Sequence, residues 1–310
     1  MNNITHNNNI THNNITNNNN IISNNSNANK VIGVTSGGGD SIVNCLMMLE
    51  QGYEVIFLNV DHGQKCALGE RIACKAIVEQ LQNQGYPCRL EIVEIPWLGT
   101  LGGSGLTDDK MEVPDGLKGV YESTIKTIFT PGRNAVLLGI AASIAERERA
   151  EYITFGCNQS EIAYADNTKA FLDAYTKVLE YACYHIHPKV ISPEWEMDKV
   201  EIYKWAISHG FGELLNYTWS CDNSPHKLIE NPTHRNQVQA GGYCGCCRNR
   251  RLVFYILNKM YSSEEYIDGQ SYANPQWFFE VFLPTIREKG IPLRKWFSKY
   301  ALELGSYVLP

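Results

Sequence analysis

The sequence predicts an α/β fold: a doubly wound parallel sheet with helices on both faces. After Val31, short β-branched runs alternate with longer amphipathic segments, which is the pattern of βαβ units. The first run, residues 31–35, leads directly into the glycine-rich turn Ser36-Gly-Gly-Gly-Asp-Ser41. Polar motifs follow the later runs as well, and the carboxyl ends of parallel strands are where such sheets collect ligands.

The elements follow in order along the chain. β-Branched and apolar runs predict four strands, at residues 31–35, 54–60, 89–95 and 151–155. Helical periodicity predicts helices between them, at residues 41–51, 67–84 and 134–149. From 168 to 209 the pattern is helical, with a break at Ile191-Ser-Pro193 and a restart at Asp198, a plausible N-cap. A polar loop over 221–247 precedes a helix from about Arg248 to Met260.

Composition changes divide the chain into four parts. Residues 1–30 contain fifteen Asn and one charged residue, Lys30, so we expect a disordered leader. Residues 31–220 form the predicted α/β domain, and residues 221–262 form a metal-binding loop and helix. Residues 263–310 carry a bulky aromatic set divided by prolines, which predicts short helices packed on the body or on a partner subunit.

Charge and cysteine content narrow the class of protein. A net charge of −6 over 310 residues argues against a broad electrostatic grip on nucleic acid. The chain shows no secretory signal pattern and no run of about eighteen apolar residues, so we expect a soluble, cytoplasmic protein with no membrane partner. Ten Cys in a reducing compartment more often bind metal or do chemistry than form disulfides.

The glycine turn is the strongest chemical signal. Successive free N–H groups in Gly37, Gly38 and Gly39 form an anion nest without Cβ atoms, and Ser41 opens a helix whose N-terminus favours negative charge. The turn lacks the Lys of a Walker loop and the Rossmann spacing. It resembles the Ser-Gly-Gly-x-Asp-Ser pyrophosphate loop of the N-type ATP pyrophosphatases, which release pyrophosphate while adenylating an acceptor. An ordinary glycine-rich strand-to-helix turn is the alternative.

Three weaker motifs lie at the other strand ends. Asp61 and Gln64 suit a ribose, a metal ion or a phosphate, or else an ordinary polar turn. In Pro131-Gly-Arg-Asn134 the Asn is a good N-cap, and Arg133 is free to clamp a phosphate or carboxylate unless it is a surface Arg. Gly156 allows a close backbone approach, and Asp166 is suited to a purine-like base, or caps the next helix together with Asn167.

The cysteine cluster is the second strong signal. Cys244 and Cys247 form a Cys-x-x-Cys knuckle, with Cys221 as third ligand of a tetrahedral Zn²⁺. Cys246 is the adjacent candidate for the fourth ligand, and His226 and His234 are its rivals. A redox or sulfur-carrying pair, or thiols with no such role, are the alternatives.

In this order the motifs resemble the 7-cyano-7-deazaguanine synthase family, from about Val31 to Tyr261. The resemblance implies an adenine-nucleotide α-hydrolase-like fold and ATP-dependent conversion of 7-carboxy-7-deazaguanine and ammonia into the nitrile. It implies roles for the loop residues Thr35, Ser36, Gly37, Gly38, Gly39, Asp40 and Ser41, with Asp61 and Gln64, on ATP and Mg²⁺. It also implies that Asp40, Arg133 and Lys199 assist catalysis, that Arg133, Asn134, Gly156 and Asp166 bind the deazaguanine, and that zinc orders the loop. A homodimer is the expected assembly, with no direct contact to nucleic acid.

The chain also departs from that family. Arg250 stands where the family usually has its last Cys, a longer insertion separates Cys221 from Cys244, and Thr168 stands where Arg is common. A divergent ligase that attaches a deazaguanine to a protein or other macromolecule is therefore the first alternative. A tRNA sulfurtransferase is the second, and a zinc-stabilised binding protein without enzymatic activity is the third.

Overall fold

The computed structural model describes residues 29–114, 127–158, 164–225, 227–228, 238–240 and 244–257, together with 284, 288, 299 and 300. Residues 1–28 of the expected disordered leader and almost all of the expected helical extension over 263–310 lie outside these residues, as do His226 and His234. Lys30, the last residue of the predicted leader, instead begins a strand, because its backbone continues the ladder of the central sheet. The insertion between Cys221 and Cys244 is described only in part.

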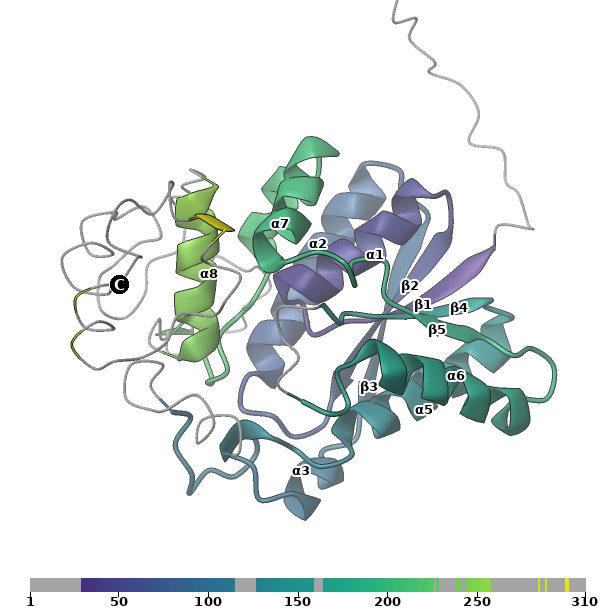
Figure 1. Ribbon diagram of the computed structural model, residues 1–310, viewed down its shortest axis with the longest axis horizontal. Helices are drawn as coiled ribbons and strands as arrows, with labels where there is room; N and C mark the ends of the chain where they lie inside the picture. The colour runs from purple at the N-terminus through teal and green to yellow at the C-terminus, as the bar shows by residue number, and fades with distance from the viewer. Residues whose placement is uncertain are drawn as a thin grey trace, which may run out of the picture.

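A five-stranded parallel sheet forms the centre of the molecule, in the order β3-β2-β1-β4-β5 (Figure 1). The strands are β1 Lys30–Val34, β2 Glu54–Asp61, β3 Cys88–Glu94, β4 Tyr152–Phe155 and β5 Lys189–Ile191. From β1 the chain first adds strands on one side and then returns to add β4 and β5 on the other. The strand order therefore reverses at β1 and β4, which is where doubly wound sheets bind ligands.

Helices cover both faces of this sheet. The helices are α1 Gly39–Glu50, α2 Ala67–Asn83, α3 Trp97–Leu101, α5 Arg133–Glu148, α6 Lys169–Ala182, α7 Lys199–Ser208 and α8 Gly245–Ile256. Helices α1, α2 and α7 lie on one face, and α5 and α6 lie on the other (Figure 1). A 3-10 helix, Gly212–Tyr217, follows α7, and the antiparallel pair β6 Lys227–Leu228 and β7 Val238–Gln239 precedes α8.

Alternation along the central strands produces two separate cores. Val31 of β1 and Phe57 of β2 face the core under α1, α2 and α7, whereas Ile32 and Ile56 face the core under α5 and α6. Both cores are fully enclosed at these positions, as expected for a parallel sheet buried on both faces. Cys244 and Phe254 join the first core, so α8 packs on the body of the α/β domain.

The predicted fold class is confirmed, and all four predicted strands are present within one residue at either end. Strand β5 is an addition, because the sequence pattern over 168–209 predicts only helix with one break.

The residues that cap the helices also differ from expectation. Gly132, with φ 71°, precedes α5 instead of Asn134, and Thr168 caps α6 by accepting a hydrogen bond from Phe171 N. Asp198 caps α7 as predicted, in a capping box with Glu201.

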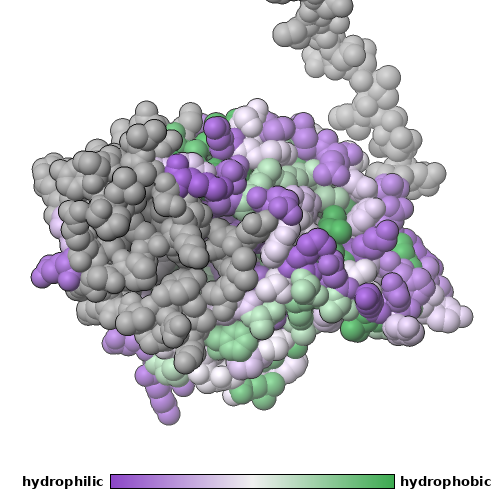
Figure 2. Space-filling model, viewed as in Figure 1, coloured by the Kyte–Doolittle hydropathy of each residue, from purple (hydrophilic) through white to green (hydrophobic). Residues whose placement is uncertain are grey.

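Within the described residues no helix is long and apolar enough to cross a membrane. The green surface along the lower edge of Figure 2 lies over α3, where Trp97 and Leu101 are 55% and 72% exposed.

Two residues of the C-terminal extension, Lys299 and Tyr300, contact the Asp198 carboxylate at the start of α7, at 2.8 and 2.9 Å.

Candidate functional site

A pocket of about 310 Å³ opens at the carboxyl ends of β1 and β4, the point where the strand order reverses. Its walls come from the glycine turn, the start of α5, the start of α7 and the segment that leads to Cys221. Most residues that the sequence pointed to line it, namely Thr35, Ser36, Gly38, Gly39, Asp40, Ser41, Gln64, Arg133, Asn134, Gly156, Lys199, Cys221 and Cys246. Gly37, Asp61, Asp166, Cys244 and Cys247 are outside this set.

Close packing requires glycine at two positions of the glycine turn, independently of any ligand. A Cβ on Gly37 would lie 2.8 Å from the Glu70 carbonyl oxygen, and φ there is 72°. A Cβ on Gly39 would lie 2.0 Å from the Tyr203 hydroxyl. These contacts add a packing role to the phosphate contact expected of all three glycines, which stays a prediction. Two of the three make room for α2 and α7.

Hydrogen bonds hold the turn in place before any ligand arrives. Thr35 Oγ1 accepts from Gly37 N at 3.0 Å and lies 3.1 Å from Ser41 Oγ, which donates to the Gly38 carbonyl oxygen. The turn is also tied to the segment before Cys221, because Trp219 N donates to the Gly37 carbonyl at 2.8 Å. A preorganised ring of N–H and O–H groups at the start of α1 suits a polyphosphate.

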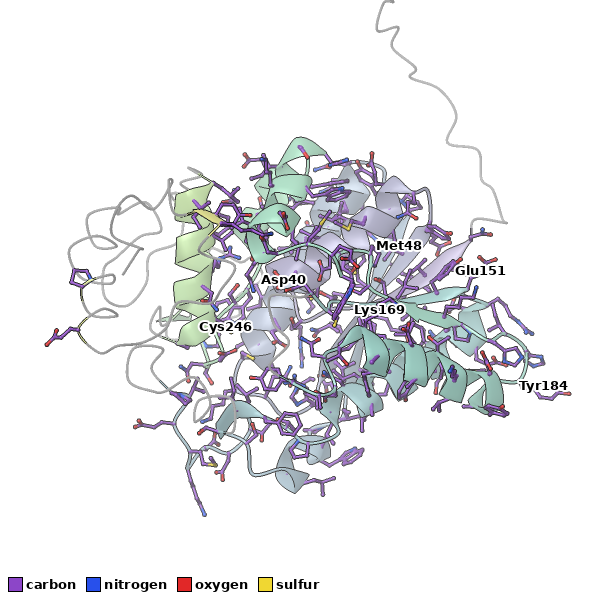
Figure 3. The ribbon with its side chains drawn as sticks, viewed as in Figure 1. Asp40, Met48, Glu151, Lys169, Tyr184 and Cys246 are labelled. Carbon is purple, nitrogen blue, oxygen red and sulfur yellow. The ribbon has the colours of Figure 1, made fainter. Side chains whose placement is uncertain are left out.

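Asp40, labelled in Figure 3, lines the pocket and connects three parts of the chain. Its carboxylate forms an ion pair with Lys199 at 3.0 Å and accepts a hydrogen bond from Asn158 Nδ2 at 3.2 Å. Asp40 and Lys199 are 15% and 11% exposed in their side chains, so water screens this pair only weakly. The family resemblance implied that Lys199 assists catalysis, and its side chain lies in the wall of the pocket.

Arg133 and Asn134 begin α5 and both line the pocket. Arg133 Nε donates to Asn134 Oδ1 at 3.2 Å, and a guanidinium has further N–H donors besides this one. Asn134 Nδ2 donates to the Asp166 carbonyl oxygen at 2.9 Å. Asn134 therefore orients the loop after β4, rather than capping its own helix.

Asp61 is engaged away from the pocket. Its carboxylate accepts from Gly63 N at 3.0 Å and pairs with Arg71 at 2.7 Å. Gln64 lies deeper, with its amide oxygen bound to His62 N at 2.8 Å and its amide nitrogen 2.7 Å from Glu70 Oε2. Of the two residues expected to hold the nucleotide here, Gln64 is the one at the pocket.

His62 and Glu70 complete this wall, and the sequence interpretation missed both. His62 is 5% exposed, and burial, helped by the nearby Arg133 guanidinium, lowers its pKa from 6.5 to about 4. Burial raises the pKa of the Glu70 carboxyl above its ordinary value. The only sequence signal for Glu70 was its place in the first turn of α2, where an acidic residue is expected for the helix dipole alone.

The loop after β4 contributes an aromatic wall. Tyr164 and Phe129 line the pocket with stacked rings, 5.8 Å between centroids and 12° between planes. Gly156 lies close to α1, since a Cβ there would be 3.0 Å from Ser41 Cα. Asp166 presents its backbone carbonyl to Asn134, and its carboxylate is not among the groups that line the pocket.

Three cysteine sulfurs gather behind the pocket. Cys221, Cys244 and Cys247 are buried, and their sulfur atoms all lie within 4.8 Å of one another. Tetrahedral Zn–S bonds of about 2.3 Å require sulfur separations of about 3.8 Å, so the group fits a thiolate-bound metal with small movements. The hydrogen bond with Cys221, together with burial, raises the pKa of Cys244 to about 12. A bound cation would lower this pKa, because it would stabilise the thiolate.

Cys246 is not part of this group. It follows Gly245 on the first turn of α8 and lines the pocket instead, so the structure does not bring the predicted fourth ligand to the other three. Figure 3 places Cys246 at the α8 side of the site and Asp40 at the α1 side.

Arg250, at the position where the family usually has a Cys, has a structural role. It is 1% exposed, and its guanidinium donates to Thr218 Oγ1 and, at 2.8 Å, to the Leu215 carbonyl. The same guanidinium lies 4.7 Å above the Phe254 ring. Arg250 thus joins α8 to the 3-10 helix before the Cys221 segment, and a guanidinium offers no metal ligand.

Comparison with known proteins gives consistent matches. The model of the family described as Queuosine biosynthesis protein QueC matches residues 30–258. The chain is 34% identical over 237 residues to the 7-cyano-7-deazaguanine synthase of Methanocaldococcus jannaschii, covering 73% of this chain and 95% of that protein. The same-named protein of Methanococcus aeolicus is 31% identical over 238 residues, covering 73% and 94%. A solved 4-thiouridine synthetase–RNA complex with bound ATP is 23% identical, covers 60% of this chain and 42% of that one, and has a TM-score of 0.39.

Proposed function

The chain belongs to the queuosine biosynthesis protein QueC family, as its motifs predicted, and from this we propose that it converts 7-carboxy-7-deazaguanine and ammonia into 7-cyano-7-deazaguanine with ATP. Its relatives are named 7-cyano-7-deazaguanine synthase, a carbon–nitrogen ligase. The observation that carries the proposal is the pocket at the strand-order reversal, where the glycine turn meets Asp40, Lys199 and Arg133.

The proposed reaction uses two equivalents of ATP. In the first half the substrate carboxylate attacks the α-phosphorus and pyrophosphate leaves, and ammonia then attacks the acyl carbon to give the amide and AMP. In the second half the amide oxygen attacks the α-phosphorus of a second ATP and pyrophosphate leaves again. The adenylated amide loses one N–H proton to become an imidate, and loss of AMP and of the second N–H proton then gives the nitrile. Each adenylation turns a poor leaving group, oxide or hydroxide, into AMP.

The pocket residues supply positioning and charge for these steps. The N–H groups of the turn and the Ser36 and Ser41 hydroxyls are placed to receive the departing pyrophosphate at the start of α1. Lys199 offers a cation there, held by Asp40. Arg133 supplies the second cation, suited to the substrate carboxylate or the α-phosphate. A Mg²⁺ ion on the phosphates would neutralise further charge.

The three grouped cysteines have a structural role in this proposal. Cys221, Cys244 and Cys247 would hold Zn²⁺ and so join the segment after the 3-10 helix to the start of α8. That segment forms one wall of the pocket, since Trp219 and Cys221 line it. Zinc would thus fix the wall while the chemistry takes place at the turn.

The test is product analysis with purified protein, ATP, ammonium and 7-carboxy-7-deazaguanine. We expect the free nitrile, with two AMP and two pyrophosphate released per nitrile, and a rate at least about a hundredfold lower in the Asp40→Asn variant. Release at a stoichiometry of one, with an amide as the final product, would reject the second activation. A deazaguanine adduct on the protein in intact-mass spectra, without free nitrile, would support the divergent ligase instead.

A further inference from the structure

The Glu70 carboxylate is a pocket-lining group to which the reaction steps above give no role. It projects from the first turn of α2. Gln64 Nε2 donates to one carboxylate oxygen at 2.7 Å, and Cys66 Sγ donates to the other at 3.2 Å. These two donors fix the plane of the carboxylate. An ionised carboxylate has about four acceptor positions, so each oxygen keeps one position for a further donor.

The other pocket carboxylates have different neighbours. Among the described residues that line the pocket, the acidic side chains are Asp40, Glu70 and Asp222. Asp40 is paired with Lys199 at the phosphate end. Asp222 lies against the cysteine group, where its backbone N–H donates to Cys244 Sγ at 3.5 Å. Glu70 is therefore the carboxylate suited to a ligand's N–H donors.

A second polar group on the same wall also points to a ligand. His62 lines the pocket with 5% of its surface exposed, and its Nδ1 has no hydrogen-bond partner in the described structure. Leaving a buried nitrogen without a partner is costly, and in proteins such atoms usually meet a ligand or water. Gln64 joins these two residues, because its amide oxygen accepts from His62 N while its amide nitrogen donates to Glu70.

We propose that Glu70 is the specificity residue for the base, accepting hydrogen bonds from the ring N1–H and the 2-amino group of the deazaguanine. This inference rests on the proposed function, because it concerns the same substrate in the same pocket. Two adjacent N–H donors on a flat ring match two adjacent acceptor positions on one carboxylate, as they do for Arg and carboxylate. The 7-carboxylate lies at the far edge of the bicycle, so this arrangement directs it away from Glu70.

The electrostatics fit an N–H ligand better than an anion. Burial raises the Glu70 pKa, so the ionised carboxylate is destabilised at this position. Two N–H donors from a bound base stabilise the ionised form and recover that cost. An anionic group placed here would add repulsion to the desolvation.

Binding to two ligands tests the inference without turnover. The ligands are 7-carboxy-7-deazaguanine and its analogue without the 2-amino group, each titrated by calorimetry with saturating α,β-methylene-ATP. We expect the wild type to prefer the amino ligand by roughly tenfold to a hundredfold, the usual discrimination of a bidentate base contact. Glu70→Gln should bind the amino ligand more weakly and lose most of the preference, because the amide presents a donor to a donor.

Matched variants separate recognition from folding. Glu79→Gln on the exposed side of the same helix should keep the wild-type preference. Glu70→Asp keeps the charge on a side chain that is one methylene shorter, so we expect an intermediate preference for the amino ligand. Thermal melting of each variant checks that it folds.

An unchanged preference in folded Glu70→Gln, or a wild type without any preference, would overturn the assignment of Glu70 while leaving the synthase proposal intact. If the wild type binds ATP but neither deazaguanine ligand, the proposed function fails and this inference fails with it.

Discussion

Lys199 Nζ lies 3.0 Å from Asp40 Oδ2, and this ion pair joins the first residue of α7 to the first turn of α1. The two helices pack on the same face of the sheet, and both residues of the pair line the pocket. Each partner fixes the other's side chain: Asp40 holds the Lys199 ammonium at the phosphate end, and Lys199 compensates the buried charge of Asp40. In the proposed reaction, charge placed this way would be preorganised for the departing pyrophosphate.

We predict that Asp40→Asn and Lys199→Met each lower the rate of ATP-dependent pyrophosphate release at least about a hundredfold, because either change removes the positioned cation. The double variant should be about as slow as either single variant, since the two residues act as one unit. Lys169→Ala with Asp173→Ala is the control, a 2.8 Å pair that is more than half exposed. Additive losses in the double variant would contradict the model of a single unit.

The zinc content of variants should distinguish the three cysteines that bind the metal from Cys246. We predict that Cys221→Ser, Cys244→Ser and Cys247→Ser each lose bound zinc, because each removes one of three grouped thiolates. Cys246→Ser should keep it, since this side chain faces the pocket. Elemental analysis by mass spectrometry after dialysis gives the zinc-to-protein ratio. Loss of zinc from Cys246→Ser would restore the four-cysteine assignment made from the sequence.

Arg250 should be important for stability. We predict that Arg250→Ala lowers the free energy of unfolding by roughly 3 kcal/mol, since it removes two buried hydrogen bonds and the contact of the guanidinium with the Phe254 ring. Arg250→Lys should cost roughly half as much, because Lys keeps a charge but lacks the planar fork. Urea denaturation measures both. An Arg250→Lys variant as stable as wild type would mean that the fork geometry contributes nothing.

The α/β body was predictable because its signals are local. Strand runs and helical periodicity were long enough to locate β1 to β4, α1, α2 and α5, whereas β5 has three residues, too few for a pattern. Asn134 was expected to cap α5, but whether its side chain bonds its own backbone or the Asp166 carbonyl depends on the loop after β4. Tertiary contacts decided that choice, and no local pattern reports them.

Some residues of the candidate site could likewise be predicted from local sequence, whereas others could not. The glycine turn and Cys221, Cys244 and Cys247 stood out because their residue types and spacing are rare. Glu70 and His62 carry no such pattern, and they matter only because folding places them beside Gln64 at one pocket wall. Asp61 followed a strand as expected, yet Arg71 one helical turn into α2 pairs with it outside the pocket.

The C-terminal extension should influence the site through α7. Tyr300 Oη donates to the Asp198 carboxylate, which caps the helix that begins at Lys199. We predict that Tyr300→Phe raises the KM for ATP severalfold with a small change in melting temperature, because a loosened cap displaces Lys199 slightly. Tyr181→Phe, at a site that is 90% exposed, is the control. Unchanged kinetics would show that the contact only anchors the chain.

His62 should make stability depend on pH in a narrow window. Burial, with Arg133 nearby, lowers its pKa from 6.5 to about 4 in the folded protein. Between these values the unfolded chain binds the proton more readily, so stability falls as the pH drops from about 6.5 to 4. The full loss is roughly 3 kcal/mol, because a tenfold difference in proton affinity between the folded and unfolded chain corresponds to about 1.4 kcal/mol.

In His62→Gln this contribution is absent, so the stability difference between wild type and variant should shrink by that amount as the pH falls across the window. Urea unfolding at pH 7.5, 6.5, 5.5 and 4.5 measures it, with the exposed His187→Gln as a control that should run parallel to wild type. A His62→Gln curve that also runs parallel to wild type would mean that His62 protonates freely in the fold. Its unpartnered Nδ1 would then lose its value as a sign of a ligand.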